Sequence, residues 1–152
     1  MQSKFSKLLL CPNCNSGNLE KTGVDLCCPE CLNTYKVTDE ILRFVDDDYH
    51  SNFGLQWNKF SQVQLDSFNG TSLSESRLLT QSGMKPADFK DKKILEVGAG
   101  NGRFTEILLK YGAEVVAVDY STAIEANYNN NRSHKGEIIF IQADLFCLPF
   151  KY

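Results

Sequence analysis

The sequence predicts an α/β protein in which half of a doubly wound parallel sheet follows a small cysteine-rich unit. Two observations carry this prediction. Near the amino terminus, four of the six cysteines form two Cys-Pro-x-Cys pairs. Over residues 91–152, apolar runs that are typical of buried strands alternate with helical patterns, and a glycine-rich turn follows the first run.

Length and composition limit the classes of protein that need to be considered. The 152 residues allow one domain, or a small domain with part of a larger one, and 42% hydrophobic and 23% charged residues are typical of a globular chain. The net charge of −3, without a basic run, does not indicate nucleic-acid binding. No stretch approaches the roughly 18 apolar residues of a membrane helix. Leu8–Leu10 is too short for a secretory signal, so we expect a cytoplasmic protein.

The paired cysteines predict a structural zinc site. "CPNC" at 11–14 and "CPEC" at 28–31 are separated by 13 residues, and two such knuckles supply the tetrahedral thiolate set that structural zinc prefers. Four thiolates leave no open position for catalysis, so the metal would hold a small unit together. The alternatives are a redox pair, or buried cysteines without a metal. The predicted ligands are Cys11, Cys14, Cys28 and Cys31, with Cys27 outside the set.

Strands are expected around these knuckles, at 19–28 and 33–45. The pattern "CPxC…CPxC…YxVxDEILRF" resembles the small zinc-ribbon family that activates tRNA and translation-factor methyltransferases, and similar ribbons occur fused ahead of methyltransferase domains. The resemblance implies a zinc ribbon over residues 1–45.

Residues 46–90 are expected to be an aromatic-rich, helical connecting segment. Its apolar residues predict packing against the next domain, and a lid over a ligand pocket is the alternative. A helix is expected from a cap at Ser72 or Ser74 through Ser82, with Gly83 closing it. The apolar residues in question are Phe53, Leu55, Trp57, Phe60, Val63, Leu65 and Phe68.

From residue 91 onward the order β-α-β-α-β is expected. Strands are predicted at 94–97, 113–121 and 137–146, and helices at 104–111 and 121–134. The first turn reads G-x-G-x-G, so it lacks the third glycine of the dinucleotide fingerprint and the lysine of a P-loop. Asp119 ends the second strand, where a carboxylate accepts hydrogen bonds from ribose hydroxyls, and Asp144 ends the third. Taken singly, Asp119 is equally explained as a helix cap and Asp144 as a turn former.

"EVGAGNG" at 96–102 and "DLFCLPF" at 144–150 resemble two motifs of class I S-adenosylmethionine-dependent methyltransferases. The resemblance implies a partial Rossmann-like sheet over 91–152 that binds S-adenosyl-L-methionine. It also implies the role of each residue. Glu96 orients the methionine end, Gly98, Ala99, Gly100 and Gly102 let the backbone approach the cofactor, Asp119 binds the ribose, and Tyr120, Asp144 and Leu145 contact the adenine.

The function that these motifs imply is methyl transfer to an unknown acceptor, by a methyltransferase or its cofactor-binding fragment. No catalytic residue can be named. Because the family's sheet continues beyond the third strand, the chain alone is expected to be inactive, and self-association or a partner chain is expected at the incomplete sheet. The alternative is a non-catalytic zinc-ribbon interaction module with a vestigial half domain.

Overall fold

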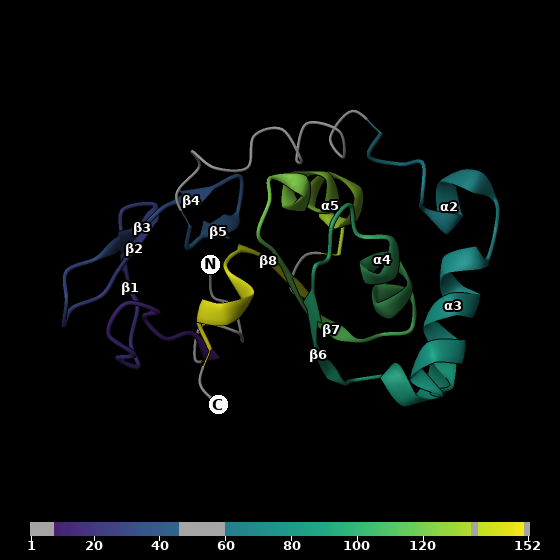
Figure 1. The fold of residues 1–152 in the computed structure, drawn as a ribbon, viewed down its shortest axis with the longest axis horizontal. Helices are drawn as coiled ribbons and strands as arrows, with labels where there is room; N and C mark the ends of the chain where they lie inside the picture. The colour runs from purple at the N-terminus through teal and green to yellow at the C-terminus, as the bar shows by residue number, and fades with distance from the viewer. Residues whose placement is uncertain (1–7, 46–59, 135–136, 151–152) are drawn as a thin grey trace.

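The computed structural model describes residues 8–45, 60–134 and 137–150. Figure 1 shows three layers, with a small antiparallel sheet on one side, a larger sheet in the middle, and helices on the other side. Among the described residues, no helix is both long enough and apolar enough to cross a membrane.

The small sheet lies within the cysteine-rich segment. β1 (Glu20–Thr22), β2 (Asp25–Cys27) and β3 (Thr34–Tyr35) pair antiparallel in the order β1-β2-β3. Gly23, with a φ of 65°, lies between β1 and β2, where a tight hairpin requires a left-handed residue. The strands fall within the two predicted ranges, 19–28 and 33–45.

The larger sheet has five strands, in the order β4-β5-β8-β7-β6. β6 (Lys93–Val97), β7 (Glu114–Asp119) and β8 (Ile138–Gln142) are parallel and confirm the three strands predicted after residue 91. The hairpin of β4 (Val37–Thr38) and β5 (Ile41–Arg43) comes from the cysteine-rich segment, and β5 pairs parallel with β8. The amino-terminal segment therefore supplies two strands to the sheet that carries the glycine turn.

The two faces of this sheet are buried by different partners. α4 (Arg103–Lys110) and α5 (Ala123–Asn131) confirm the two predicted helices and pack on one face through Leu108 and Ile124. The cysteine-rich segment covers the other face. In that second core, residues of the cysteine-rich segment ahead of β4 pack with residues of the larger sheet. The first group is Leu9, Cys11, Leu26, Cys28 and Tyr35, and the second is Leu42, Val116, Val118, Ile139 and Ile141.

β6 is one edge of the five-stranded sheet, and β4 is the other. Leu95 and Val97 are 46% and 42% exposed, although Val116 and Val118, their register partners in β7, are buried. Apolar side chains of β6 are therefore open to solvent at this edge, whereas the cysteine-rich segment packs against the rest of that face.

The connecting segment is anchored by polar contacts. α2 (Asp66–Asn69) precedes α3 (Leu73–Ser82). α3 begins after Ser72 and ends at the left-handed Gly83 as predicted, but Ser72 makes no side-chain capping hydrogen bond. The buried carboxylate of Asp66 accepts hydrogen bonds from the backbone N–H groups of Ser74 and Glu75. A short 3-10 helix, η3 (Pro86–Phe89), then leads into β6.

The prediction that apolar residues pack this segment against the next domain is wrong for three of the four described residues. Leu65 is buried, whereas Phe60, Val63 and Phe68 are each more than half exposed. Hydrogen bonds replace apolar contacts here: the carbonyl of Ser61 accepts from the side-chain amides of Asn101 and Asn130. Phe53, Leu55 and Trp57, on which the packing and lid hypotheses also depend, lie outside the described residues.

Candidate functional site

The glycine turn lies where β6 ends and α4 begins. Gly98, Gly100 and Gly102 have φ angles of 72°, 52° and 88°, a region that side chains other than glycine rarely adopt. A Cβ placed on Gly98 or Gly100 would have no atom within 4 Å, so the backbone there borders open space. A Cβ on Gly102 would lie 2.3 Å from Oδ1 of Asn127 in α5. The first two glycines therefore offer an open surface, and the third allows α4 and α5 to pack closely.

Asp119 joins this turn to the end of β7. Its Oδ2 accepts a hydrogen bond from the N–H of Gly100 at 2.8 Å. Its Oδ1 accepts from the backbone N–H and the hydroxyl of Ser121, at 2.8 and 2.7 Å. An ionised carboxylate offers about four acceptor positions, so the three donors leave about one for a ligand hydroxyl. Asp119 thus has both a structural role and a remaining capacity to bind.

Glu96 lies on the helix side of β6 and begins a polar network that is largely buried. The hydroxyl of Thr105 donates to Oε2 of Glu96 at 2.6 Å and accepts from the side-chain amide of Asn127 at 2.8 Å. Asn131 donates to Oδ1 of Asn127 at 3.0 Å. Burial, with a contribution from the nearby negative charge of Asp119, raises the pKa of Glu96 from 4.5 to about 7. The protein therefore holds a carboxyl group here that lacks a cationic partner among the groups that shift its pKa.

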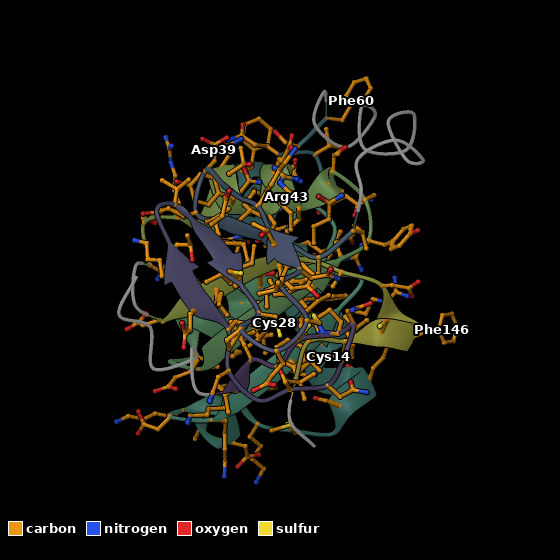
Figure 2. All side chains as sticks on the ribbon, turned by 90° about the vertical axis from the view of Figure 1, so that its left-hand side faces the viewer. Cys14, Cys28, Asp39, Arg43, Phe60 and Phe146 are labelled. Carbon is orange, nitrogen blue, oxygen red and sulfur yellow. The ribbon has the colours of Figure 1, made fainter. Side chains whose placement is uncertain are left out.

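The loop after β8 places the third predicted acid at the same edge of the sheet. Oδ1 of Asp144 accepts from the N–H of Phe146 at 2.8 Å, and this bond caps the 3-10 helix η4 (Leu145–Cys147). Leu145 is 53% exposed and Phe146 is 95% exposed, and Figure 2 shows the Phe146 ring projecting away from the body of the protein. Tyr120, after β7, is 39% exposed. Apolar side chains thus remain open to ligands beside Asp144.

The structure brings most of the predicted cofactor-site residues to the carboxyl edge of three neighbouring strands. Ala99 differs, because its side chain is buried in the helix-side core and its N–H donates to the carbonyl of Val118. Sequence reasoning missed Thr105 and Gln142, which hold site residues in place. Gln142 ends the otherwise apolar strand "IIFIQ", and that polar residue in an apolar run was the available signal.

The four predicted zinc ligands form one cluster, in which all four Sγ atoms lie within 4.8 Å of one another. Cys11 and Cys31 Sγ are 3.6 Å apart, and Cys14 and Cys28 Sγ are 3.5 Å apart, so these short contacts join one knuckle to the other. Zinc bound to four thiolates at 2.3 Å in a tetrahedron requires sulfur separations of about 3.8 Å. The geometry fits one zinc ion. Figure 2, viewed from the side of the cysteine-rich segment, shows Cys14 and Cys28 near each other.

The two knuckles have the same backbone geometry. In each, the first cysteine carbonyl accepts from the residue after the second cysteine, at 2.8 Å for Asn15 and 2.9 Å for Leu32. Both of those residues are left-handed, with φ of 58° and 61°. Polar side chains also reach the sulfurs. The Ser16 hydroxyl lies 3.0 Å from Cys28 Sγ and is the main cause that lowers the pKa of this thiol to about 6. The Tyr35 hydroxyl lies 3.0 Å from Cys11 Sγ.

One protein family matches the segment that carries the glycine turn. Residues 95–152 match the family described as a methyltransferase domain. The matched segment contains the glycine turn, Asp119 and Asp144. Phosphoethanolamine N-methyltransferase 1 of Zea mays is 39% identical over 57 residues, which are 38% of this chain and 11% of that protein. The chain therefore spans only a small part of the curated relative it matches.

Solved structures of methyltransferases resemble parts of the fold. A protein of Methanococcus maripaludis, assigned as S-adenosyl-L-methionine-dependent, is 16% identical with a TM-score of 0.48, over 69% of this chain and 47% of that one. Phosphoethanolamine N-methyltransferase 1 of Haemonchus contortus is 27% identical with a TM-score of 0.43, over 63% of this chain and 22% of that one. That structure holds phosphoethanolamine and S-adenosylhomocysteine.

Proposed function

We propose that the chain is an S-adenosylmethionine-dependent methyltransferase, or the cofactor-binding part of one, and that it binds its cofactor at the carboxyl edge of β6, β7 and β8. One observation carries the proposal. The segment that matches a methyltransferase domain contains a glycine turn that is open to solvent and hydrogen-bonded to an acid at the end of the next strand. The methyl acceptor is left unassigned.

The residues present fit this cofactor. Gly98 and Gly100 border open space that a side chain would fill, as close approach of a ligand to the backbone requires. Asp119 retains about one acceptor position for a ribose hydroxyl, and the carboxyl of Glu96 provides a place for a cationic group. An ammonium group beside Glu96 would favour its ionised form and lower the raised pKa.

The bound cofactor would supply a methyl group activated on a sulfonium. The chain's own residues would hold and orient it: Asp119 at the ribose, Glu96 at the methionine end, and Tyr120 and Asp144 at the adenine. Orientation of the reacting groups and exclusion of water provide much of the rate enhancement in such a transfer.

We also propose that Cys11, Cys14, Cys28 and Cys31 bind one structural zinc ion. The sulfur separations and the equivalent knuckles support this over a redox pair. Metal analysis of the purified chain should give one zinc per chain, and Cys28→Ser should lose it. The adjacent Cys27→Ser is the matched control and should retain it. Equal zinc content in both variants would contradict the assignment.

The module hypothesis finds less support than the enzyme hypothesis. A ribbon that docks a separate methyltransferase needs a free apolar surface, but Leu9, Leu26 and Tyr35 are buried against the chain's own sheet. β5 is likewise paired with β8 and cannot accept a partner strand on that side. These contacts favour a ribbon that serves as part of the methyltransferase fold.

Calorimetric titration of the zinc-loaded chain with S-adenosylhomocysteine tests the cofactor site. Asp119→Ala removes a charged acceptor for a ribose hydroxyl, an interaction of about 1.5–3 kcal/mol, so binding should weaken about 10- to 150-fold. Asp88→Ala is the control, because Asp88 also accepts a backbone N–H, that of Lys85, but lies in η3 outside the matched segment. Absence of binding by a folded, zinc-loaded chain would overturn the proposal.

A further inference from the structure

Arg43 is a buried cation in the larger sheet. It is the last residue of β5 and is 9% exposed. Its register partner is Gln142, the last residue of β8, which in turn pairs with Asp119, the last residue of β7. Register partners in adjacent strands point to the same side of a sheet. Three polar residues therefore end three neighbouring parallel strands in one row, on the side covered by α5.

The side chains of Arg43 and Gln142 form a chain of hydrogen bonds that joins α5 to the backbone after β7. Nη1 of Arg43 donates to Oε1 of Gln142 at 2.7 Å, and Nη2 pairs with Oε1 of Glu125 in α5 at 2.9 Å. Gln142 is 2% exposed, and its Nε2 donates to the backbone carbonyl of Tyr120 at 3.1 Å. Because the arginine accepts no hydrogen bond, it fixes which end of the amide turns toward it and which turns toward Tyr120.

Loss of the arginine would release this amide. If the amide rotated, its oxygen would face the carbonyl of Tyr120 and repel it, in place of the present donor. Tyr120 lies directly after Asp119, whose carboxylate is bonded to Gly100 and Ser121. Movement of this backbone would therefore shift the Tyr120 ring and disturb the bonds between the strand end and the glycine turn.

Stability alone does not account for a charge at this position. Removal of the Arg43 charge from water costs several kcal/mol, whereas its partner Glu125 stays 38% exposed, and well-packed apolar residues often replace a buried charge without loss. β5 is otherwise apolar here, since Ile41 and Leu42 are fully buried. The guanidinium instead provides directional hydrogen bonds, and its two donors hold α5 and the Gln142 amide in fixed positions relative to β5.

We infer that Arg43, although it belongs to the cysteine-rich segment, is a positioning residue for the adenosine side of the proposed cofactor site, and that it acts through Gln142 on the backbone of Tyr120. The inference rests on the proposed function. It assigns the amino-terminal segment a role in ligand affinity in addition to its role in covering the sheet.

The test uses the complete zinc-loaded chain and two ligands, S-adenosylhomocysteine and 5′-methylthioadenosine, which lacks the amino-acid end. Arg43→Met should weaken both by the same factor, about 5- to 10-fold, which corresponds to one lost hydrogen bond. Arg43→Lys should recover part of the affinity, because one ammonium cannot reproduce both guanidinium contacts. Arg77→Met makes the same substitution at an exposed position of α3 and should leave both affinities unchanged.

Two further variants separate positioning from general destabilisation. Phe89→Leu loosens a buried position in η3, ahead of β6, and its affinities should stay unchanged when they are measured well below its melting temperature. Gln142→Met removes the intermediate link, so adding Arg43→Met to it should cause no further loss of affinity. Gln142→Met also serves as the primary test if Arg43→Met does not fold.

Each outcome decides between the two claims. Equal losses for both ligands, absent in Arg77→Met and Phe89→Leu, support the inference. Unchanged affinities in Arg43→Met and Gln142→Met overturn it while the proposed function stands. A loss confined to S-adenosylhomocysteine also overturns it, because that loss would lie at the amino-acid end. Absence of binding by the unaltered chain overturns the proposed function, and the inference with it.

Discussion

The three glycines of the turn should respond differently to the same substitution. Alanine at Gly98 adds a methyl group to open space, so its main cost is the left-handed backbone, about 1–2 kcal/mol. Alanine at Gly102 has the same backbone cost and also places Cβ 2.3 Å from Oδ1 of Asn127 and 2.5 Å from Nδ2 of Asn131. Overpacking of this kind costs a further 1–3 kcal/mol or so.

The clash at Gly102 also affects buried hydrogen bonds. Asn127 donates to Thr105, and Asn131 donates to Asn127, so neither amide can move without breaking a bond in the network that holds Glu96. A broken buried hydrogen bond adds about 1–3 kcal/mol. We therefore expect Gly102→Ala to lower the free energy of unfolding by about 3–8 kcal/mol, at least about 2 kcal/mol more than Gly98→Ala.

Ligand affinity should fall more in Gly98→Ala than in Gly102→Ala, which is the opposite of the order expected for stability. Gly98→Ala covers the surface that the cofactor would approach, so it should weaken S-adenosylhomocysteine binding with little loss of stability. Urea unfolding and calorimetric titration of both variants, with the chain loaded with zinc, measure the two effects. Equal losses of stability at both positions would refute the assignment of Gly102 to helix packing. Unchanged affinity in a folded Gly98→Ala would refute the claim that the cofactor approaches the backbone at Gly98.

Three more perturbations have expected outcomes. Because burial raises the pKa of Glu96 from 4.5 to about 7, the chain should lose up to about 3 kcal/mol of stability as the pH rises between these values. Glu96→Gln should lack this loss. If the melting temperatures of the two proteins differ by the same amount at pH 5 and at pH 8, the prediction is contradicted. Burial acts to raise the pKa of Asp66, but hydrogen bonds from Glu75, Ser74 and Thr71 hold this pKa below 3.8, so the stabilising contribution of Asp66 should be lost as the pH falls below that value. Acid titration of Asp66→Asn should show a smaller loss of stability. An acid transition that Asp66→Asn leaves unchanged would contradict this prediction. Zinc removal by a chelator should weaken S-adenosylhomocysteine binding, and zinc addition should restore it, because the first knuckle contacts the loop after β8. An affinity that does not depend on zinc would show that the two sites are uncoupled.

Local patterns in the sequence predicted much of the fold. The strands and helices after residue 91, the start and end of α3, and the four-cysteine cluster were all expected from spacing and composition, and the structure confirms their positions. Asp119 was also placed correctly at a strand end next to the glycine turn. Such features depend on residues that are close in sequence, or on motifs whose ligand geometry is narrow.

The pairing of β5 with β8 was missed because it joins residues about a hundred positions apart. Alternation and apolar runs identify a strand but do not name its neighbour. The adjacent apolar residues Ile41 and Leu42 were the available sequence signal, because consecutive apolar residues are typical of a strand that is buried on both faces. The roles of Arg43 and Gln142 were missed for the same reason, because each role depends on contact with the other residue, which is distant in the sequence.

The same pairing sets an order of events during synthesis. β5 leaves the ribosome long before β8 exists, so for that interval its hydrogen-bonding edge and the apolar residues of the cysteine-rich segment have no sheet to cover them. Contacts between such distant residues also make folding slow. Early capture of a metal ion by the cysteines would close the knuckles first and hold β4 and β5 as a preformed template. The supply of zinc during translation would then determine how much of the chain reaches the folded state rather than aggregating.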